Sequence, residues 1–171
     1  MNRFKEIDVN EVKDNFISLI GKDYALITVK NDDKINMMTA SWGFFGVMWN
    51  KNAVSLVIRP SRYTYQFLKE GSEFTINFLQ NGYDDVLKFC GTKSGRDYNK
   101  VKETGLTPIE ICKNSVLFSE SKLAFLCKKV YVQDMDKNLF CNKDFSKKMY
   151  PDGDVHTMFI AEIEKVYCLK D

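Results

Sequence analysis

The sequence predicts a mainly β protein with short helices: a β-barrel core in a single domain over residues 1–171. Strand-like runs dominate the chain, helical patterns are few and short, and apolar and polar residues often alternate, which favours a barrel over a doubly wound sheet. A length of 171 residues favours one domain, and 44% hydrophobic with 28% charged residues suits a chain that buries its own core.

The expected strands are short apolar runs rich in β-branched residues, and several are bounded by turn signals. They cover residues 24–30, 35–42, 53–58, 73–79, 123–135 and 155–169. The NDDK turn signal at 31–34 joins the first two as a hairpin. The last strand alternates cleanly at 159–164, so one of its faces should meet water.

The expected helices are short. Asn10 should cap the first, whose apolar face carries Val12, Phe16, Leu19 and Ile20. The others share a helical pattern beside a loop or strand end, and cover residues 62–70 (ended by Gly71), 84–90 and 97–104. Between the last two, the segment CGTKSGRD at 90–97 is expected to be a loop.

Composition disfavours several classes of protein. A net charge of +2, with both signs interspersed, gives no large basic face for nucleic acid. The first residues lack a signal-peptide core, and the longest apolar stretch, ASWGFFGVMW, is too short to span a bilayer. Five cysteines without a CxxC pair disfavour a disulfide framework and a zinc site. We therefore expect a cytoplasmic protein with no membrane segment and no metal.

An anion site is expected in the stretch RPSRYT, where the strand at 53–58 ends. Pro60 pushes Arg59 toward an extended conformation, and Ser61 is a suitable N-cap for the following helix, whose first turn has free backbone N–H groups. Arg59, Arg62 and the hydroxyls of Ser61 and Thr64 add side-chain donors of the kind that bind phosphate. The alternative for this stretch alone is an exposed corner with solvated arginines.

A second phosphate-binding corner is expected in CGTKSGRD. It sets Lys93, Ser94 and Arg96 around Gly91 and Gly95, which would let backbone N–H groups curl into an anion-binding nest. It is not a Walker A loop, because the order GxxxxGK[ST] is absent. A Gly-Lys-Ser loop alone is a weak signal, but two such corners in one small domain support each other.

The run NMMTASWGFFGVMW at 36–49 offers polar and aromatic groups to a flat ligand. Asn36, Thr39 and Ser41 alternate with apolar residues, so one edge presents amide and hydroxyl groups. The aromatic residues suited to cover the faces of a heterocycle are Trp42, Phe44, Phe45 and Trp49. The alternative is a core strand that runs into a hydrophobic loop, and such a loop would need cover from a ligand or a second subunit.

Taken in order, these segments resemble the flavin reductase-like, FMN-binding split-barrel family, and within it the flavoredoxin-like group. The resemblance rests on INMMTASWG, RPSRYTY, EFTINFL, CGTKSGRD and a late His-x-x-Phe-Ile-x-Glu segment, and it covers about residues 24–167. The pair RPSRYT and CGTKSGRD is more specific than either alone. The resemblance implies an antiparallel six-stranded split β-barrel, a homodimer and FMN bound near the subunit interface.

The resemblance also implies which residues bind the cofactor. Those expected at the FMN phosphate are Arg59, Ser61, Arg62, Thr64, Lys93 and Ser94. Those expected along the ribityl chain and isoalloxazine ring are Asn36, Thr39, Ser41 and Trp42, with Asn77 and Cys90 as further lining candidates. Two departures from the family pattern, at Thr28-Val29-Lys30 and at Asn99, could alter the loop near the substrate.

His156 is the only histidine and the only candidate for direct contact with substrate. A lone histidine is usually structural or exposed. The resemblance implies that a histidine at this place faces the flavin and donates a hydrogen bond to the ring or the substrate. The thiol of Cys90 is expected to be buried and inert rather than redox-active.

The expected function is therefore that of a flavin-dependent oxidoreductase, NAD(P)H:FMN reductase-like. It would pass electrons from NAD(P)H or a redox protein through FMN to an acceptor. Because the cofactor carries the chemistry, the sequence leaves open the donor, the acceptor and whether FMN is a prosthetic group or an exchangeable substrate. The alternative is a non-catalytic FMN-binding carrier or sensor. Nucleic-acid binding by the basic corners is disfavoured, because it needs a contiguous basic face.

Overall fold

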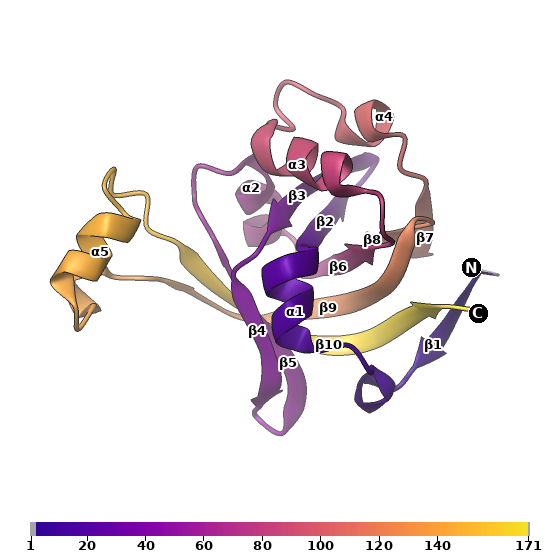
Figure 1. Cartoon of the computed structure of the whole chain (residues 1–171), viewed down its shortest axis with the longest axis horizontal. Coiled ribbons are helices and arrows are strands. Elements are labelled where there is room, and N and C mark those ends of the chain that lie inside the picture. The colour runs from indigo at the N-terminus through magenta and orange to yellow at the C-terminus, as the bar shows by residue number, and fades with distance from the viewer. Residues whose placement is uncertain (1–2, 171) are drawn as a thin grey trace.

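The computed structural model describes residues 3–170, and its mainly β architecture with short helices confirms the predicted fold class (Figure 1). Its strands are β1 (Phe4–Ile7), β2 (Ala25–Asn31), β3 (Lys34–Ala40), β4 (Gly43–Met48), β5 (Lys51–Ile58), β6 (Glu73–Leu79), β7 (Pro108–Cys112), β8 (Ser115–Phe118), β9 (Ser121–Asp134) and β10 (Thr157–Leu169). Its helical segments are η1 (Val9–Glu11), α1 (Phe16–Ser18), η2 (Leu19–Asp23), α2 (Tyr63–Glu70), α3 (Asp84–Thr92), α4 (Lys100–Thr104), η3 (Lys137–Leu139) and α5 (Lys143–Met149).

The main sheet is antiparallel and, within residues 3–170, has eight strands rather than the six that the resemblance implied. Its order is β3-β2-β6-β9-β10-β5-β4, and β1 pairs with β10. The edge strands β3 and β4 are consecutive in the chain, and only Ser41 and Trp42 separate them. The sheet must therefore curl until its two edges meet at these residues, which is the split of the barrel.

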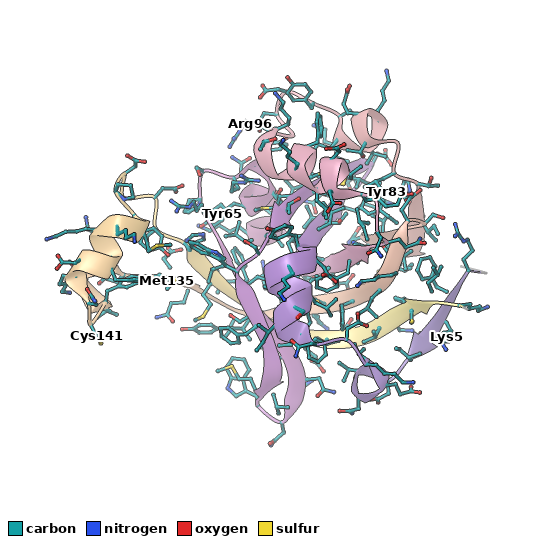
Figure 2. All side chains as sticks on the ribbon, viewed as in Figure 1. Lys5, Tyr65, Tyr83, Arg96, Met135 and Cys141 are labelled. Atoms are coloured by element: carbon teal, nitrogen blue, oxygen red, sulfur yellow. The ribbon has the colours of Figure 1, made fainter. Side chains whose placement is uncertain are left out.

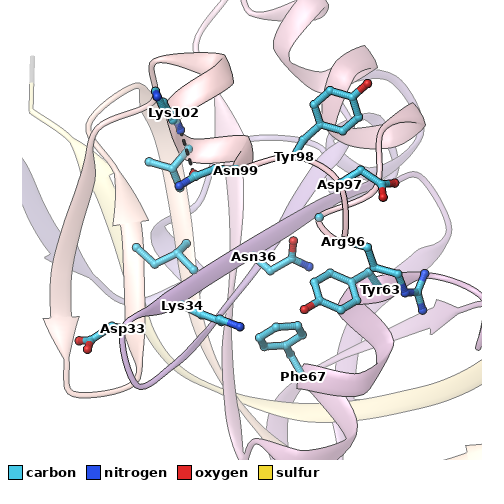
Figure 3. Close-up of a pocket in the computed structure, with 13 residues that line it drawn as sticks. Asp33, Lys34, Asn36, Tyr63, Phe67, Arg96, Asp97, Tyr98, Asn99 and Lys102 are labelled. Atoms are coloured by element: carbon cyan, nitrogen blue, oxygen red, sulfur yellow. Dashed lines mark hydrogen bonds between the residues drawn. The ribbon is translucent and has the colours of Figure 1, made fainter.

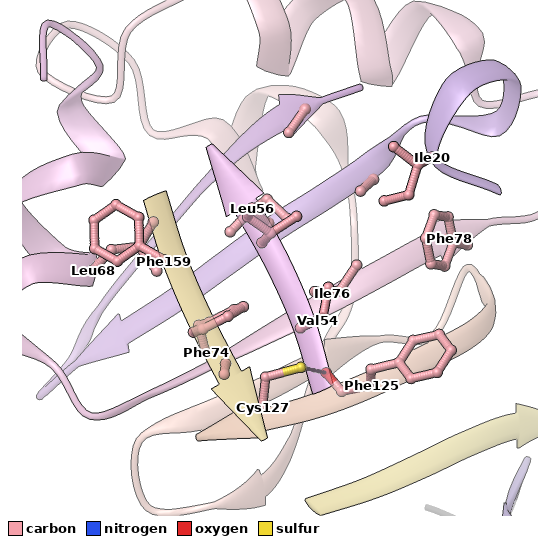
Figure 4. Close-up of a cluster of buried hydrophobic side chains, with 14 of the residues drawn as sticks. Ile20, Val54, Leu56, Leu68, Phe74, Ile76, Phe78, Phe125, Cys127 and Phe159 are labelled. Carbon is pink, nitrogen blue, oxygen red and sulfur yellow. Dashed lines mark hydrogen bonds between the residues drawn. The ribbon is translucent and has the colours of Figure 1, made fainter. Parts of the chain in front are cut away.

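The barrel interior is filled by apolar side chains. Alternate residues of β5, β6, β9 and β10 point inward because successive side chains of a strand face opposite sides. Figure 4 shows this core, whose large members include Leu56, Phe74, Phe78, Phe125 and Phe159. Burying each such side chain stabilises the fold by about 1.5–3 kcal/mol. A ligand of any size must therefore bind outside the barrel.

Two local expectations near the N-terminal half are wrong. The first helical turn, η1, is capped by Asp8 rather than Asn10, because the Asp8 carboxylate accepts the Asn10 backbone N–H at 2.8 Å. The apolar run after Trp42 forms strand β4 instead of a loop, and β4 pairs along its length with β5. Trp49 and Asn50 turn this hairpin with φ of 53° and 58°, as a type I′ turn requires.

Three parts of the chain had no structural expectation: β1, the β7–β8 hairpin and the segment between β9 and β10. We call this last segment, residues 135–156, the arm. The Met135 backbone N–H donates to the His156 carbonyl at 3.0 Å and closes the base of the arm. Figures 1 and 2 show that it projects from the barrel with α5, from Met135 near its base to Cys141 at its far end. Within residues 3–170, no helix is long and apolar enough to cross a membrane.

Candidate functional site

The two predicted phosphate-binding corners meet in one hollow of about 190 Å³, which we call the basic pocket. It lies where the start of α2, the end of α3 and strand β3 come together. Its lining residues are Met38, Ser61, Arg62, Tyr63, Thr64, Thr92, Lys93, Ser94, Gly95, Arg96 and Lys100. The structure thus brings together five of the six residues expected at a phosphate, although they lie about 30 positions apart in the sequence.

Lys100 is the pocket residue that the sequence did not reveal. Its side chain is only 4% exposed, and its ammonium donates to the carbonyls of Met37 at 2.8 Å and Cys90 at 2.9 Å. Within residues 3–170 it forms no ion pair with a carboxylate. Burial, partly opposed by Cys90 and aided by the nearby Arg62 charge, lowers the pKa of Lys100 to about 8. No motif in the sequence distinguishes Lys100 from the other lysine of the same short helix, Lys102.

Arg62 is a second, half-buried cation of the pocket. It is the N-cap of α2, and burial lowers the pKa of its guanidinium. Ser61 was expected to be this cap, but Arg62 still has an extended backbone with φ −72° and ψ 132°, so the helix begins one residue later. The Ser61 hydroxyl instead donates to the Asp154 carboxylate at 2.6 Å. No side chain caps α2, so its first-turn N–H groups have no side-chain acceptor.

Gly95 is required by a close approach rather than by the expected nest. A Cβ at this position would lie 2.0 Å from Asn36 Oδ1 and 2.9 Å from the Tyr63 ring. Gly91 and Gly95 are absent from the positive-φ glycines of the described residues, and Gly91 belongs to the last turn of α3. The expected anion-binding nest and the expected start of the loop at residue 90 are therefore wrong. Glycine at position 95 is still needed, because it allows the loop to pack directly against β3.

A second hollow, of about 270 Å³, opens at the split of the barrel, and we call it the split pocket. Its lining residues are Met38, Thr39, Ala40, Ser41, Trp42, Val57, Arg59, Arg62 and His156. Met38 and Arg62 also line the basic pocket, so the two hollows adjoin. Three residues expected along a flat ring, Thr39, Ser41 and Trp42, lie here together.

Arg59 lies in the split pocket and not in the basic pocket, in contrast to its expected place at a phosphate. Its guanidinium donates to two carbonyls of the arm, Asp154 at 3.1 Å and Met149 at 3.2 Å. The same group lies 5.3 Å from the centre of the Tyr150 ring and 4.0 Å from the Asp154 carboxylate. Arg59 therefore attaches the arm to the barrel.

His156 stands at the base of the arm and is 7% exposed. Its Nδ1 lies 2.9 Å from the Tyr150 hydroxyl, and its ring centre lies 4.9 Å from that of Trp42. Burial lowers the pKa of His156 to about 4, and the Arg59 charge adds to this effect, so the ring is neutral near pH 7. Where the Tyr150 hydroxyl donates to Nδ1, Nε2 carries the proton and can donate; in the other tautomer Nδ1 donates to the hydroxyl.

The remaining expected residues divide into two groups. Asn36 is buried beside the basic pocket, and its amide donates to the Thr64 hydroxyl at 2.7 Å. Asn77 and Cys90 line neither pocket. Asn77 is 0% exposed beneath β8, where its amide makes hydrogen bonds with Thr28, Thr75, Phe118 and Ser121. Cys90 is also 0% exposed, and burial raises the pKa of its thiol to about 11.

The two ends of the site therefore differ in their chemistry. The basic pocket offers an ammonium, guanidinium groups, hydroxyls and helix N–H groups, which is the donor set of a phosphate site. The split pocket offers hydroxyls, an aromatic face and a neutral imidazole, which suits a flat polar ring. Its only ionisable side chains, among the residues described, are two arginines and His156.

Comparison with known proteins bears on the family and the fold of the chain. A family model described as the flavin reductase like domain matches residues 17–171. An uncharacterized protein of Archaeoglobus fulgidus is 31% identical over 142 residues, which is 80% of this chain and 67% of that protein.

Several solved structures share the fold. The flavoredoxin of Methanosarcina acetivorans is 19% identical with a TM-score of 0.69, covering 97% of this chain and 76% of that one. An FMN-binding protein of Thermus thermophilus is 19% identical with a TM-score of 0.66, covering 84% and 68%. The NADH:FAD oxidoreductase SgcE6 of Streptomyces globisporus is 14% identical with a TM-score of 0.63, covering 84% and 73%.

Proposed function

Because the chain belongs to the flavin reductase-like family, we propose that it is a flavoprotein whose cofactor is FMN. The phosphate of FMN binds in the basic pocket and its isoalloxazine ring in the split pocket. When bound, FMN supplies the electron-transfer chemistry. The observation that carries the proposal is the buried ammonium of Lys100 beside the half-buried guanidinium of Arg62, neither of which has a carboxylate partner within residues 3–170.

A phosphate dianion is the partner that these two cations lack. Burying an ion without a counter-charge costs several kcal/mol, and a bound anion offsets this cost. A chloride ion or a single carboxylate would leave donors unused, because the hydroxyls of Ser94 and Thr64 and the N–H groups of α2 surround the same hollow. A tetrahedral group with several acceptor oxygens uses the whole set.

In the split pocket the chain's own residues orient the ring and exclude water. The Thr39 hydroxyl donates to the Leu87 carbonyl at 2.6 Å, which fixes its orientation beside Ser41. We assign the Tyr150 hydroxyl as the donor to His156 Nδ1, which leaves the Nε2 proton for a hydrogen bond to the ring or to a substrate oxygen. Trp42, 41% exposed, gives an aromatic wall at the mouth of the pocket.

The activity we propose is transfer of electrons from NAD(P)H or a redox protein to an acceptor, in the manner of flavin reductases and flavoredoxins. We also propose that the chain is a homodimer. The β4–β5 hairpin exposes large apolar side chains, among them Phe44 (65%), Val47 (75%) and Trp49 (55%), which a second copy would cover. We further propose that the protein is located in the cytoplasm.

A carrier or sensor without catalysis is the second candidate function. One observation favours it: His156, the only histidine, is neutral near pH 7, so the split pocket has no residue poised to exchange a proton there. A carrier would take its electrons from a protein partner rather than from a nicotinamide.

The test begins with the colour of the purified protein and the identity of the chromophore released on denaturation. The unliganded protein is then titrated with FMN and with riboflavin, which lacks the phosphate, by flavin fluorescence. We expect FMN to bind at least about 100-fold more tightly, as loss of a charge-assisted phosphate contact predicts. Equal affinity for the two compounds would refute the phosphate role of the basic pocket.

Anaerobic mixing of the FMN-loaded protein with NADH or NADPH separates the two candidate functions. Rapid bleaching of the flavin absorption supports the reductase. A flavin that stays oxidised with both nicotinamides supports the carrier or sensor.

A further inference from the structure

The outer part of the arm, residues 137–148, is an exposed surface outside both pockets, and we call it the arm tip. It consists of η3, a short connection and most of α5. Leu139 is 76% exposed and Phe145 is 51% exposed. Figure 2 shows Cys141 of the arm tip at one end of the molecule and Lys5 at the other. Apolar side chains that gather on a projecting segment suit contact with another macromolecule.

The arm tip is strongly basic. It carries four lysines and one aspartate, so its net charge is +3, whereas the whole chain has a net charge of only +2. The exposed lysines are Lys137, Lys143, Lys147 and Lys148. The single carboxylate, Asp144, lies 3.6 Å from the Lys147 ammonium, but both side chains are largely exposed, so solvent screens this pair. The complementary surface is therefore acidic, and such charges speed the encounter of two proteins.

A continuous series of aromatic rings, which we call the ring chain, connects the arm tip with the split pocket. Between ring centres, Phe145 lies 6.3 Å from Phe140, and Phe140 lies 5.8 Å from Tyr150. Tyr150 lies 5.5 Å from His156, whose ring centre is 4.9 Å from that of Trp42. These separations are those of aromatic rings in contact. Because Trp42 and His156 line the split pocket, packed atoms lead from the arm tip to the place proposed for the isoalloxazine ring.

The base of the arm keeps the ring chain in place. Arg59 donates to the carbonyls of Met149 and Asp154. The Ser61 hydroxyl donates to the Asp154 carboxylate at 2.6 Å. A protein docked on the arm tip is therefore held at a defined place relative to the split pocket. Packed atoms between the two matter, because electron tunnelling weakens less steeply through them than through water.

A second approach to the site lies on its other side. A hollow of about 580 Å³ opens between the start of β3, α2 and residues 95–102 (Figure 3). It shares Tyr63, Gly95 and Arg96 with the basic pocket, and among the described residues it shares none with the split pocket. A partner bound there would approach the phosphate end of FMN and not the ring that takes up electrons. The arm tip is therefore the better entry point for electrons.

We propose that the arm tip is the docking site of an acidic one-electron carrier protein, and that the ring chain conducts its electrons to the split pocket. This inference rests on the proposed function, because the electrons are taken up by FMN in that pocket. Each encounter oxidises one partner molecule by one electron. Two encounters supply the two electrons for full reduction of one bound FMN, and the accompanying protons come from solvent. A contact of this size suits a transient interface, which buries less than about 1,200 Å².

A second copy of the chain and a lipid surface fit the arm tip less well. A two-fold contact centred on the arm tip would bring its four lysines against themselves, and like charges repel. Binding to lipid scales with the apolar area that is buried. Among the described residues of the arm tip, only Leu139 and Phe145 are large, exposed apolar side chains. An acidic protein uses both the lysines and this small apolar area.

The test uses a plant-type ferredoxin, an acidic iron–sulfur protein, as the one-electron probe. The ferredoxin is reduced photochemically and mixed anaerobically with the FMN-loaded protein, and bleaching of the flavin is followed by stopped flow. We expect the triple variant Lys137→Glu, Lys147→Glu, Lys148→Glu to be reduced at least about tenfold more slowly at an ionic strength of about 0.1 M. Lys143 is kept, because its ammonium donates to the Asn138 carbonyl.

The control variant Lys5→Glu, Lys113→Glu, Lys170→Glu makes the same charge change at exposed positions. Figure 1 shows β1, β7 and the end of β10 on the side of the molecule away from α5. This variant should keep the rate within about threefold, because the Debye length is about 10 Å at this ionic strength. Reduced methyl viologen, which needs no docking site, should reduce all three proteins at similar rates.

Phe140→Leu separates electron transfer from docking, because it interrupts the ring chain with an apolar side chain. At saturating ferredoxin we expect bleaching to slow several-fold in this variant. The affinity of oxidised ferredoxin for the unliganded protein, measured by calorimetry, should stay the same. The triple variant of the arm tip should instead lose at least about tenfold in this affinity. Thermal unfolding is recorded for each variant, and a rate that falls with added salt in the unaltered protein repeats the test without any substitution.

The outcomes separate this inference from the proposal it rests on. Tight FMN binding with equal ferredoxin rates in both triple variants, or a salt-independent rate, overturns the inference alone. An unchanged rate in Phe140→Leu overturns the ring chain. Conversion of a dimer to a monomer by the arm-tip variant, or loss of binding to phosphatidylserine vesicles with unaltered reduction, assigns the arm tip to another occupant and also overturns it. Failure to bind FMN overturns the proposed function and, with it, the path for electrons.

Discussion

The basic pocket and the split pocket share a wall but are built in different ways. The basic pocket takes nearly all its donors from two short stretches, 61–64 and 92–96, that carry recognisable phosphate-binding residues. The split pocket draws on the end of β3, the end of β5 and the base of the arm. The charged groups also differ. Buried Lys100 and half-buried Arg62, which have no carboxylate partner within residues 3–170, line the basic pocket, whereas Arg59 in the split pocket is already held by the arm. The comparison teaches that a cation that lines a pocket can be assigned to a ligand only after its other hydrogen-bond and ion-pair partners have been examined.

The largest expected effect comes from removing the buried ammonium. Lys100→Met keeps the length of the side chain but leaves the phosphate with one buried cation fewer. We expect FMN affinity to fall about 100-fold, in line with the loss of about 2–5 kcal/mol for a buried charged partner. Riboflavin, which has no phosphate, should lose less than about threefold. Titration of both flavins by fluorescence gives the ratio.

Lys102→Met is the matched control, since Lys102 lies on the same helix and is exposed. The mutant Lys100→Met also leaves the carbonyls of Met37 and Cys90 without a donor, at a cost of about 1–3 kcal/mol in stability. Thermal unfolding should therefore be measured beside binding. A loss of affinity that is equal for FMN and riboflavin would assign Lys100 to stability alone.

The next effect is a pH dependence confined to the basic pocket. The pKa of Lys100 is about 8 in the folded protein, so this side chain loses its proton as the pH rises above 8. FMN affinity should then fall by up to about tenfold per pH unit, while riboflavin affinity stays level. The FMN phosphate is already ionised in this range, because its second pKa is near 6. Cys90, whose pKa is raised to about 11, does not titrate there.

The stability of the unliganded protein should change in the opposite sense. In the unfolded chain the pKa of Lys100 returns to its ordinary value of 10.5, so between pH 8 and 10.5 the unfolded state binds more protons. This group therefore raises the free energy of unfolding as the pH rises through that interval. Lys100→Met should remove the pH dependence of FMN affinity and also that of the free energy of unfolding. Denaturant titrations at several pH values would check the change in the free energy of unfolding. Persistence of the affinity trend in Lys100→Met would exclude Lys100 as its source.

The smallest effect is expected for Arg59, and it sharpens the contrast between the pockets. Arg59→Ala releases two carbonyls of the arm and the contact with Tyr150. We expect FMN and riboflavin to lose affinity equally, by about three- to tenfold, because a shared ring contact weakens and no phosphate contact is lost. The ratio of the two dissociation constants is the measurement. A loss of affinity for FMN alone would contradict this and would support the sequence-based expectation that Arg59 binds the phosphate.

Much of the fold could be predicted from the sequence because its signals are local. Strands β2, β3, β5, β6, β9 and β10 and helices α2, α3 and α4 follow from apolar runs, alternation and turn residues near their observed bounds. The pattern did not reveal β1 or the β7–β8 hairpin, because short strands carry little periodicity. It also mistook β4 for a loop, since an edge strand with exposed aromatic residues has no polar alternation.

For the candidate site, the sequence by itself determined which donors stand at two chain bends: Ser61, Arg62, Thr64, Lys93 and Ser94. Only the tertiary structure decided which cations share a cavity. It turned Arg59 toward the arm, buried Lys100 under both bends and moved Asn77 beneath β8. The physical reason is distance along the chain: hydrogen-bonding preferences are set by nearby residues, whereas burial and charge pairing depend on segments that meet only when the sheet closes.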